Sequence, residues 1–417
     1  MADAAPDPRT PSELFASTTA VDPPGLTAAE RLRLMEPADW RADLDALAGG
    51  LIERHRDPFH TTSPEQFDAI VARLHDRISD LSAGAILVGF DEVAAAIGDG
   101  HTFVETDDHY RRLPLELFWY GDQLRVVKSL ADDPRVLGAQ LVAIGGVAVQ
   151  DIDQRLRPLI PQGENAWYER ARSAERLTRA DVLVALDCMP DTAMGEFSLV
   201  GQDDASFTAE VASLPPGAAP SWPPPSPDAP LRMRSPDEAL AYTTLPATDA
   251  TYANFRRYDG LEQAAGQLIA HLQDTAPARL ILDLRDNGGG DYTLARHNLI
   301  YPIWQLPAIS RPGGLYVLIG RKTYSAAMVT ATDFRRETEA ILVGEPTGAR
   351  PVGYQELGTF DLPRSGLHAH CATRRYRFSD TDAAAVFPDQ RIDPDWTTDR
   401  SGHDNAIDWC LAHRATG

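Results

Sequence analysis

A serine and a run of glycines in the C-terminal part of the chain have the residue types that acyl-transfer chemistry needs. Ser325 lies in KTYSAAM, six residues after the apolar segment 315–319, and the small residues beside it allow the chain to turn into a helix. Such a serine can simply cap the helix by accepting a hydrogen bond from a free amide. The same free amides and the helix dipole can stabilise an oxyanion. Ser325 is therefore a candidate nucleophile, with the amide of Ala326 as a candidate oxyanion donor.

The glycine run supplies a candidate for the second oxyanion donor. DLRDNGGG occupies residues 283–290 and directly follows an apolar segment. Glycine allows the backbone to approach a substrate closely, because no side chain stands in the way. A phosphate-binding loop is the competing interpretation, but the run lacks both the GxGxxG spacing and a GK[ST] ending. We therefore predict that the amide of Gly289 is an oxyanion donor.

The elements around these residues alternate between strand and helix. Short apolar runs at 280–284, 315–319 and 340–344 predict buried strands, and helical periodicity precedes or separates them. This alternation favours parallel strands joined by right-handed crossovers. Reactive groups of such sheets collect at the carboxyl ends of the strands. Both the glycine run and Ser325 lie at such ends.

The rest of the chain divides by composition and periodicity. Helical spacing of apolar residues predicts a helical N-terminal region, and apolar runs broken by Gly-Asp and Gly-Gly pairs predict a small β-rich module. A segment dense in proline reads as a linker. The predicted divisions are a flexible arm (1–27), an N-terminal helical region (28–110), the β-rich module (111–160), a mixed connecting region (161–213), the proline-rich linker (214–236) and an α/β domain (237–417).

Composition excludes several classes of function. The 417 residues carry a formal charge of -22, which opposes binding to nucleic acid or to an anionic membrane. No apolar run approaches the roughly 20 residues that cross a bilayer, and the N-terminus lacks the pattern of a signal peptide. The three cysteines form no CxxC pair. We expect a cytoplasmic protein. The sequence does not determine whether it forms an oligomer.

Several segments together resemble a known family. In the C-terminal part these are LILDLRDNGGG, LIGRKTYSAAM, LVGEPTGARPVGYQE and FPDQRIDPD, and upstream of them lie IGDGHT (97–102) and GAQLVAIGGVAVQDI (138–152). They are similar, in order, to the conserved blocks of the serine peptidase family that includes tail-specific proteases, the tricorn core and the photoreceptor retinoid-binding repeats. The resemblance runs from about residue 30 to the end of the chain.

The resemblance implies a histidine as the general base. Tail-specific members use a lysine, but the matching position here is Arg350, which stays protonated and cannot accept the serine proton. Lys128 and Lys322, the chain's two lysines, do not match that position, although Lys322 is near enough in sequence to be tested. The tricorn branch uses a histidine whose counterpart is His101. The alternative for His101 is a residue of a simple turn after Gly100.

The same branch implies a carboxylate that supports the histidine. Counting back from Pro388 places it at Asp382, where the family has glutamate. Asp380 and Glu356 are alternatives, and each of the three could equally be a solvated loop residue. A neutral imidazole needs such an acceptor for its second nitrogen.

The resemblance further implies an α/β fold, with a spiral ββα (crotonase-like) catalytic domain, a PDZ-like β module at 111–160 and an N-terminal helical region. The expected activity is that of a serine peptidase, whose acyl-enzyme forms on Ser325 without metal or organic cofactor. Two alternatives remain, since a fold does not determine its substrate. One is a hydrolase or acyl-transfer enzyme for a small non-peptide substrate, and the other is a non-catalytic ligand-binding protein.

Overall fold

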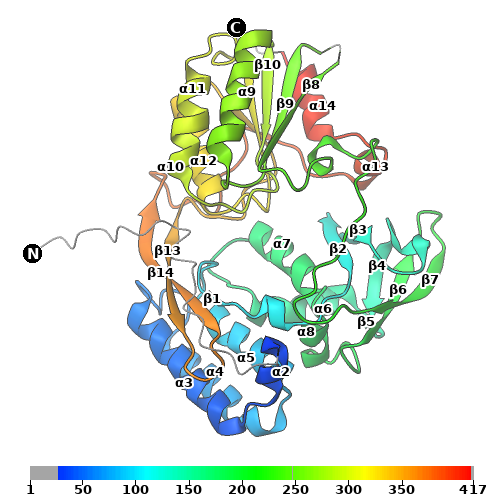
Figure 1. Ribbon diagram of the computed structural model, residues 1–417, viewed down its shortest axis with the longest axis vertical. Helices are drawn as coiled ribbons and strands as arrows, with labels where there is room; N and C mark the ends of the chain where they lie inside the picture. Colours follow the sequence, from blue (N-terminus) through cyan, green and yellow to red (C-terminus); the bar gives the residue numbers. More distant parts are fainter. Residues whose placement is uncertain (1–26, 247, 415–417) are drawn as a thin grey trace, which may run out of the picture.

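The computed structural model describes residues 27–246 and 248–414, in two halves that are stacked along the long axis of the molecule (Figure 1). One half contains the C-terminal sheet and its helices. The other contains the N-terminal helices and the β-rich module. Except for its last residue, the predicted arm 1–27 lies outside the described residues.

The C-terminal half is built on a six-stranded sheet with the order β15-β12-β11-β10-β9-β8. Its neighbouring strands are parallel, except that β8 runs antiparallel to β9. The predicted parallel pairing of the three apolar runs is thereby confirmed. The strands are β8 (Leu240–Leu245), β9 (Ala250–Phe255), β10 (Arg279–Asp283), β11 (Leu315–Ile319), β12 (Ile341–Gly344) and β15 (Gln390–Arg391).

Helices cover both faces of this sheet, which explains why its central strands are continuously apolar. Leu280 and Leu282 of β10 belong to the core that includes α9 and α12, whereas Ile281 faces the smaller core against α14. The helices of this half are α9 (Leu261–Thr275), α10 (Tyr292–Ala295), a π-helical turn (Arg296–Ile300), α11 (Tyr301–Trp304), α12 (Ala326–Glu337), α13 (Trp396–Arg400) and α14 (Asn405–Ala412).

The β-rich module is an antiparallel sheet with the order β2-β3-β4-β6-β7, and β5 pairs with β4. It extends past the predicted boundary at residue 160, because β6 and β7 come from the segment expected to be a connector. Its elements are β2 (Leu115–Tyr120), β3 (Gln123–Ser129), β4 (Gln140–Ile144), β5 (Val147–Ala148), α6 (Val149–Leu156), α7 (Ala166–Arg176), α8 (Ala180–Ala185), β6 (Met194–Val200) and β7 (Ser206–Ala212).

A long hairpin connects the two halves. Strands β13 (Val352–Asp361) and β14 (His368–Arg377) leave the C-terminal half and lie against the N-terminal helices (Figure 1). There β14 pairs with β1 (Phe103–Val104) in a three-stranded sheet. The carboxylate of Asp43, on α3, accepts the backbone N–H groups of Arg364 and Ser365 at the hairpin turn, at 2.7 and 2.8 Å.

The N-terminal region is helical as predicted, with α2 (Ala28–Arg33), α3 (Pro37–Arg54), α4 (Pro64–Arg77) and α5 (Ala83–Ala95). Ser63 and Gln66 form a capping box at the start of α4, which satisfies two amides of its first turn. Within the described part of the chain, no helix has the apolar length to cross a membrane.

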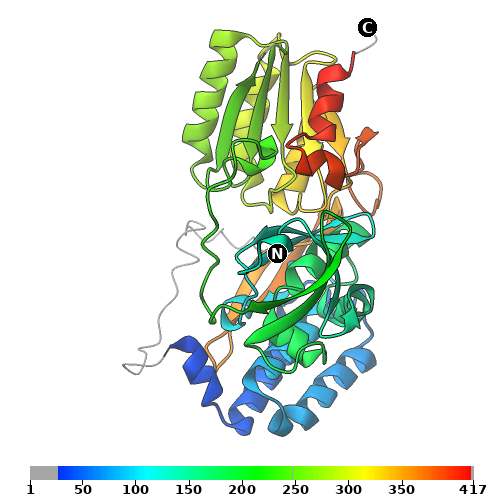
Figure 2. The same cartoon turned by 90° about the vertical axis from the view of Figure 1, so that its right-hand side faces the viewer.

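The proline-rich segment 214–236 is largely extended and passes from the module to the C-terminal half (Figure 2). Arg232 in this segment forms an ion pair with Asp399, with 2.6 Å between Nη2 and Oδ2. Both side chains are mostly buried. This ion pair therefore attaches the C-terminal end of the segment to the C-terminal half.

Candidate functional site

Ser325 has a strained backbone and a hydroxyl that does not cap its helix. It lies between β11 and α12, with φ at 49° and ψ at -125°, a conformation that residues other than glycine rarely adopt. Its side chain makes no capping hydrogen bond to the helix. Strain of this kind persists where the surrounding structure imposes it, and it is concentrated at functional sites. The helix-capping alternative for Ser325 therefore does not describe this side chain.

The hydroxyl of Ser325 faces His101. His101 Nε2 and Ser325 Oγ are 2.9 Å apart, although 224 residues separate them in the chain. The two side chains come from different halves of the molecule. This contact has the geometry of a nucleophile and its general base.

The loop of His101 is held by Asp99. Asp99 Oδ1 accepts the backbone N–H of His101 at 3.0 Å, and the hydroxyl of Thr102 donates to the same carboxylate. The hairpin adds a contact, because Ala372 N–H of β14 donates to the Thr102 hydroxyl at 3.3 Å. His101 therefore belongs to a loop with defined contacts rather than to a free turn.

His101 is 8% exposed, and burial of its imidazole disfavours the charged form. This desolvation lowers the pKa of His101 to about 4, although the charge of Asp99 and a hydrogen bond from the ring to the backbone carbonyl of Tyr354 oppose the shift. The positive charge of Arg172 adds to it. The ring is consequently neutral at neutral pH, as a proton acceptor must be.

The glycine run lies against Ser325. Gly289 has φ of 112°, and a Cβ atom there would lie 2.7 Å from Ser325 Cβ and 3.0 Å from Ala326 N. Only glycine fits this approach. In this conformation the Gly289 N–H donates to Asn287 Oδ1 at 3.0 Å, so this predicted donor is already engaged. Ala326 is the first residue of α12, where amides have no acceptor within the helix.

Asp382 is not in contact with His101. Its carboxylate pairs with Arg350 at 3.0 Å, and its side chain is 55% exposed. Glu356 accepts the hydroxyl of Tyr376, and Asp380 contacts Arg377 through its carbonyl oxygen. Within the described residues, none of the three predicted carboxylates hydrogen-bonds to His101.

Both lysines are paired elsewhere. The ammonium groups of Lys128 and Lys322 lie 2.7 and 3.8 Å from carboxylate oxygens of Glu116. Neither is engaged with Ser325. The geometry therefore favours His101 over Lys322 as the partner of the hydroxyl.

Two residues that the sequence did not single out stand beside His101. Tyr324 Oη is 3.3 Å from His101 Nδ1 and donates to Glu164 Oε1 at 2.8 Å. Both line a cavity of about 310 Å³ that also includes His101, Arg350 and Asp382. Tyr324 could have been suspected from the sequence, because it directly precedes Ser325. Glu164 belongs to no recognisable motif.

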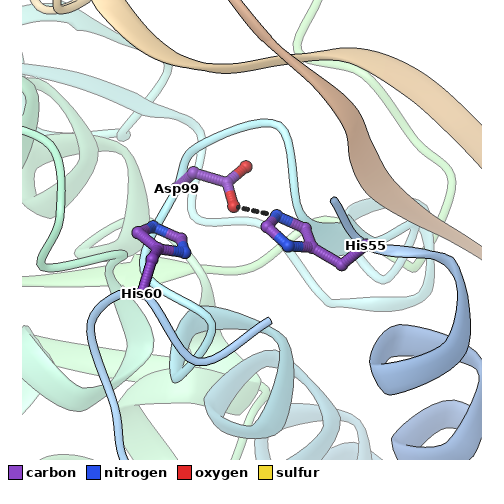
Figure 3. Close-up of side chains that lie close together, drawn as sticks. All are labelled: His55, His60 and Asp99. Carbon is purple, nitrogen blue, oxygen red and sulfur yellow. Dashed lines mark hydrogen bonds and ion pairs between the residues drawn. The ribbon is translucent and has the colours of Figure 1, made fainter. Parts of the chain in front are cut away.

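A group of two histidines and an aspartate could hold a metal by proximity alone. The candidate ligand atoms of His55, His60 and Asp99 lie within 4.8 Å of one another (Figure 3). However, His55 Nδ1 accepts the backbone N–H of Asp57 at 3.0 Å, so the ring proton is on Nε2 and is donated to Asp99 at 2.8 Å. A protonated Nε2 has no lone pair for a metal. His55 instead supports the Asp99 carboxylate that holds the His101 loop, and His60 Nδ1 lies 2.8 Å from the backbone oxygen of Asp57.

Comparison with known proteins identifies the architecture. No protein-family model and no curated sequence matches the chain. Mature CPAF aligns over 90% of this chain and 98% of its own, with a TM-score of 0.61 and 11% identity. The chain shares the fold of CPAF. CPAF complexed with lactacystin aligns equally well, over 90% and 99% of the two chains, with a TM-score of 0.62 and 12% identity.

The CPAF alignments cover both halves of the molecule, so the fold as a whole is shared. A mixed α/β architecture with several sheets is thereby established. The tricorn protease aligns over 90% of this chain and 36% of its own, with a TM-score of 0.43 and 14% identity. Since a fold does not determine a reaction, the chemistry must be argued from the site.

Proposed function

We propose that the protein is a serine peptidase in which Ser325 is the nucleophile and His101 is the general base. The observation that carries the proposal is the 2.9 Å contact between His101 Nε2 and Ser325 Oγ. The strained backbone of Ser325 and the neutral state of the buried imidazole support it. So does the order of the sequence blocks, which resembles that of a peptidase family.

In the proposed reaction, His101 Nε2 takes the hydroxyl proton while Ser325 Oγ bonds to the carbonyl carbon of the substrate. The amide of Ala326 stabilises the resulting oxyanion, and the amide of Gly289 joins it by releasing Asn287. The imidazolium then gives its proton to the leaving amine as the carbon–nitrogen bond breaks. Water, deprotonated by His101, hydrolyses the acyl-enzyme and restores the serine.

We further propose that the C-terminal half is the spiral ββα catalytic domain and that β2–β7 form the PDZ-like module. The mixed sheet with helices on both faces is consistent with the first assignment. The antiparallel sheet, whose strand order ends at β2 and β7 and whose β7 is largely exposed, is consistent with the second. An open edge can accept an extended peptide as an added strand.

Hydrolysis of a mixed peptide library tests the proposal. Wild type should cleave peptides, and Ser325→Ala and His101→Ala should each lose roughly 10²-fold or more of that activity, since they remove the nucleophile and the general base. Ser401→Ala, at an exposed serine of the same half, is the matched control and should cleave as wild type does. Cleavage that persists in Ser325→Ala would refute the nucleophile.

Assays of the same protein with peptides and with small esters test the substrate class. If peptides remain intact while small activated esters are hydrolysed in a Ser325-dependent manner, the alternative of a small-molecule hydrolase replaces the peptidase. Because a structure of mature CPAF complexed with lactacystin is known, we also expect lactacystin to compete with substrate here. Absence of both hydrolytic activities would favour the non-catalytic binding protein.

A further inference from the structure

The side of the His101 ring away from Ser325 is occupied by a phenol rather than by a carboxylate. Tyr324 Oη is 3.3 Å from His101 Nδ1, and the two rings lie 5.1 Å apart between centroids. Tyr324 is buried. Glu164, in the loop before α7, lies behind it at 2.8 Å from the phenol oxygen.

The direction of each hydrogen bond follows from the number of protons. The ionised carboxylate of Glu164 can only accept, and it receives both the Tyr324 O–H and the backbone N–H of Gly100, at 2.8 and 3.1 Å. A phenol has a single proton. Because Tyr324 gives that proton to Glu164, its oxygen can only accept at the His101 side, so His101 Nδ1 must carry the ring proton. Nε2 then presents a lone pair to the hydroxyl of Ser325.

We infer that Glu164 and Tyr324 are positioning residues that hold His101 in the Nδ1–H tautomer required of a general base. The inference rests on the proposed function and deepens it. It assigns to a tyrosine–glutamate pair the position at which the sequence predicted Asp382. A tautomer held in this way needs no carboxylate in direct contact with the imidazole.

The packing around the pair is too close to be incidental. A Cβ atom at Gly100 would lie 2.3 Å from the hydroxyl oxygen of Tyr324 and 2.5 Å from that of Tyr168. The residue before His101 is therefore a glycine that leaves room for the phenol. Its amide also supplies the second hydrogen bond of Glu164.

Among the side chains around His101, the other charged groups act on the ring through their charge rather than by a hydrogen bond to Nδ1. Asp99 is engaged by His55, Thr102 and the backbone of His101, and it acts on the ring through its charge. The charge of Arg172 opposes protonation of the ring, whereas the backbone carbonyl of Tyr354 accepts a hydrogen bond from a ring N–H and so acts beside Tyr324. The other charges near Glu164 are those of Asp99, which raises the pKa of Glu164, and Arg350, which lowers it.

Protonation of Glu164 reverses the chain of hydrogen bonds. Desolvation raises the pKa of Glu164 to about 7, against the stabilising hydrogen bonds from Gly100 and Tyr324. A protonated Glu164 donates to Tyr324, which then donates to Nδ1 and leaves the ring proton on Nε2. His101 cannot accept the serine proton in that tautomer. Activity should therefore be present above pH 7 and fall as the pH decreases through about 7.

The test compares three variants by two measurements. Tyr324→Phe removes the phenol oxygen, Glu164→Gln keeps an acceptor that does not ionise, and Tyr168→Phe removes a neighbouring buried hydroxyl as the matched control. The first measurement is the rate of Ser325 labelling by a fluorophosphonate between pH 5 and 9. The second is the ¹⁵N shift of each His101 ring nitrogen, which reports the tautomer without any need for activity.

We expect Tyr324→Phe to label about 10- to 100-fold more slowly than wild type, as part of the general-base contribution is lost. Its His101 should show a mixture of tautomers, whereas wild type at pH 8 shows the Nδ1–H form. Glu164→Gln should lose the change in rate near pH 7, and Tyr168→Phe should label as wild type does.

An unchanged tautomer and an unchanged labelling rate in Tyr324→Phe would overturn the inference. The same holds if Tyr168→Phe is as slow as Tyr324→Phe, since that would indicate general loosening of the packing. The failure of the proposed function looks different: wild type would not label at Ser325 at any pH, whatever tautomer the spectra show.

Discussion

Ser325 combines a reactive position with an unfavourable backbone conformation. Its φ of 49° would suit glycine, yet the hydroxyl is needed where the chain enters α12. A strained conformation of this type costs on the order of 1–3 kcal/mol. In this conformation Ser325 Oγ lies 2.9 Å from His101 Nε2. Mutation can remove the hydroxyl either with or without relief of the strain.

We predict that Ser325→Gly is more stable than Ser325→Ala, although both lack the nucleophile. Glycine adopts the required conformation freely, whereas alanine keeps the strain. The difference in free energy of unfolding should be about 1 kcal/mol, after allowance for the greater entropy of glycine in the unfolded chain. Thermal unfolding of the two variants measures it. An alanine variant as stable as the glycine variant would mean that Ser325 is not strained.

The contact between Ser325 and His101 could be predicted because both lie in recognisable sequence blocks. The residues on the Nδ1 side of His101 could not be predicted. Glu164 and Tyr324 are 160 residues apart and follow no periodicity, so only the folded chain shows their contact. The prediction of Asp382 did not account for Arg350, a permanent cation that forms an ion pair with that carboxylate.

At the scale of elements, the site depends on two loops that follow β10 and β11. Tyr324 N–H donates to Asn287 O at 3.1 Å, and the Thr323 hydroxyl donates to Leu284 O at 2.7 Å. These bonds join the glycine run to the loop of the nucleophile. Parallel pairing of β10 with β11 brings their carboxyl ends to the same edge of the sheet.

We predict that Gly289→Ala abolishes activity and Gly288→Ala does not. The added methyl group at Gly289 would lie 2.7 Å from Ser325 Cβ and would have to adopt φ of 112°. At Gly288 a methyl group would meet no atom within 4 Å. Fluorophosphonate labelling of both variants, with circular dichroism to verify folding, checks the prediction. Equal labelling of the two would show that the glycine run does not border the reaction.

The sequence was informative about these elements where apolar runs are long and continuous, as in β10, β11 and β12. It was less informative about the module. Hairpin signals at Gly121 and Gly145 marked β2 to β5, but β6 reaches β4 across the three helices α6, α7 and α8, and such distant pairing has no local signal.

At the scale of the molecule, the site is assembled from both halves, and the β13–β14 hairpin joins them. β14 pairs with β1, two residues beyond His101, and Asp43 of α3 holds the far turn of the hairpin. The position of His101 therefore depends on the docking of a segment from the C-terminal half. The pairing of β1 with β14 was not predicted, because it joins segments that are more than 250 residues apart.

We predict that Asp43→Ala destabilises the protein and slows the labelling of Ser325. Two backbone N–H groups lose a charged acceptor, which should lower the free energy of unfolding by about 1–3 kcal/mol. Asp45→Ala, at an exposed position of the same helix, is the control. Denaturant unfolding and labelling rates measured together test the coupling. A destabilised Asp43→Ala protein that labels at the wild-type rate would show that hairpin docking does not position His101.

The central claim is that an imidazole from one half activates a hydroxyl from the other. Its most direct test is mass spectrometry of the protein after reaction with a fluorophosphonate, with the adduct localised by peptide mapping. The account predicts one adduct, on Ser325, in wild type and little or none in His101→Ala. An adduct on another residue, or full modification of Ser325 in His101→Ala at the wild-type rate, would contradict it.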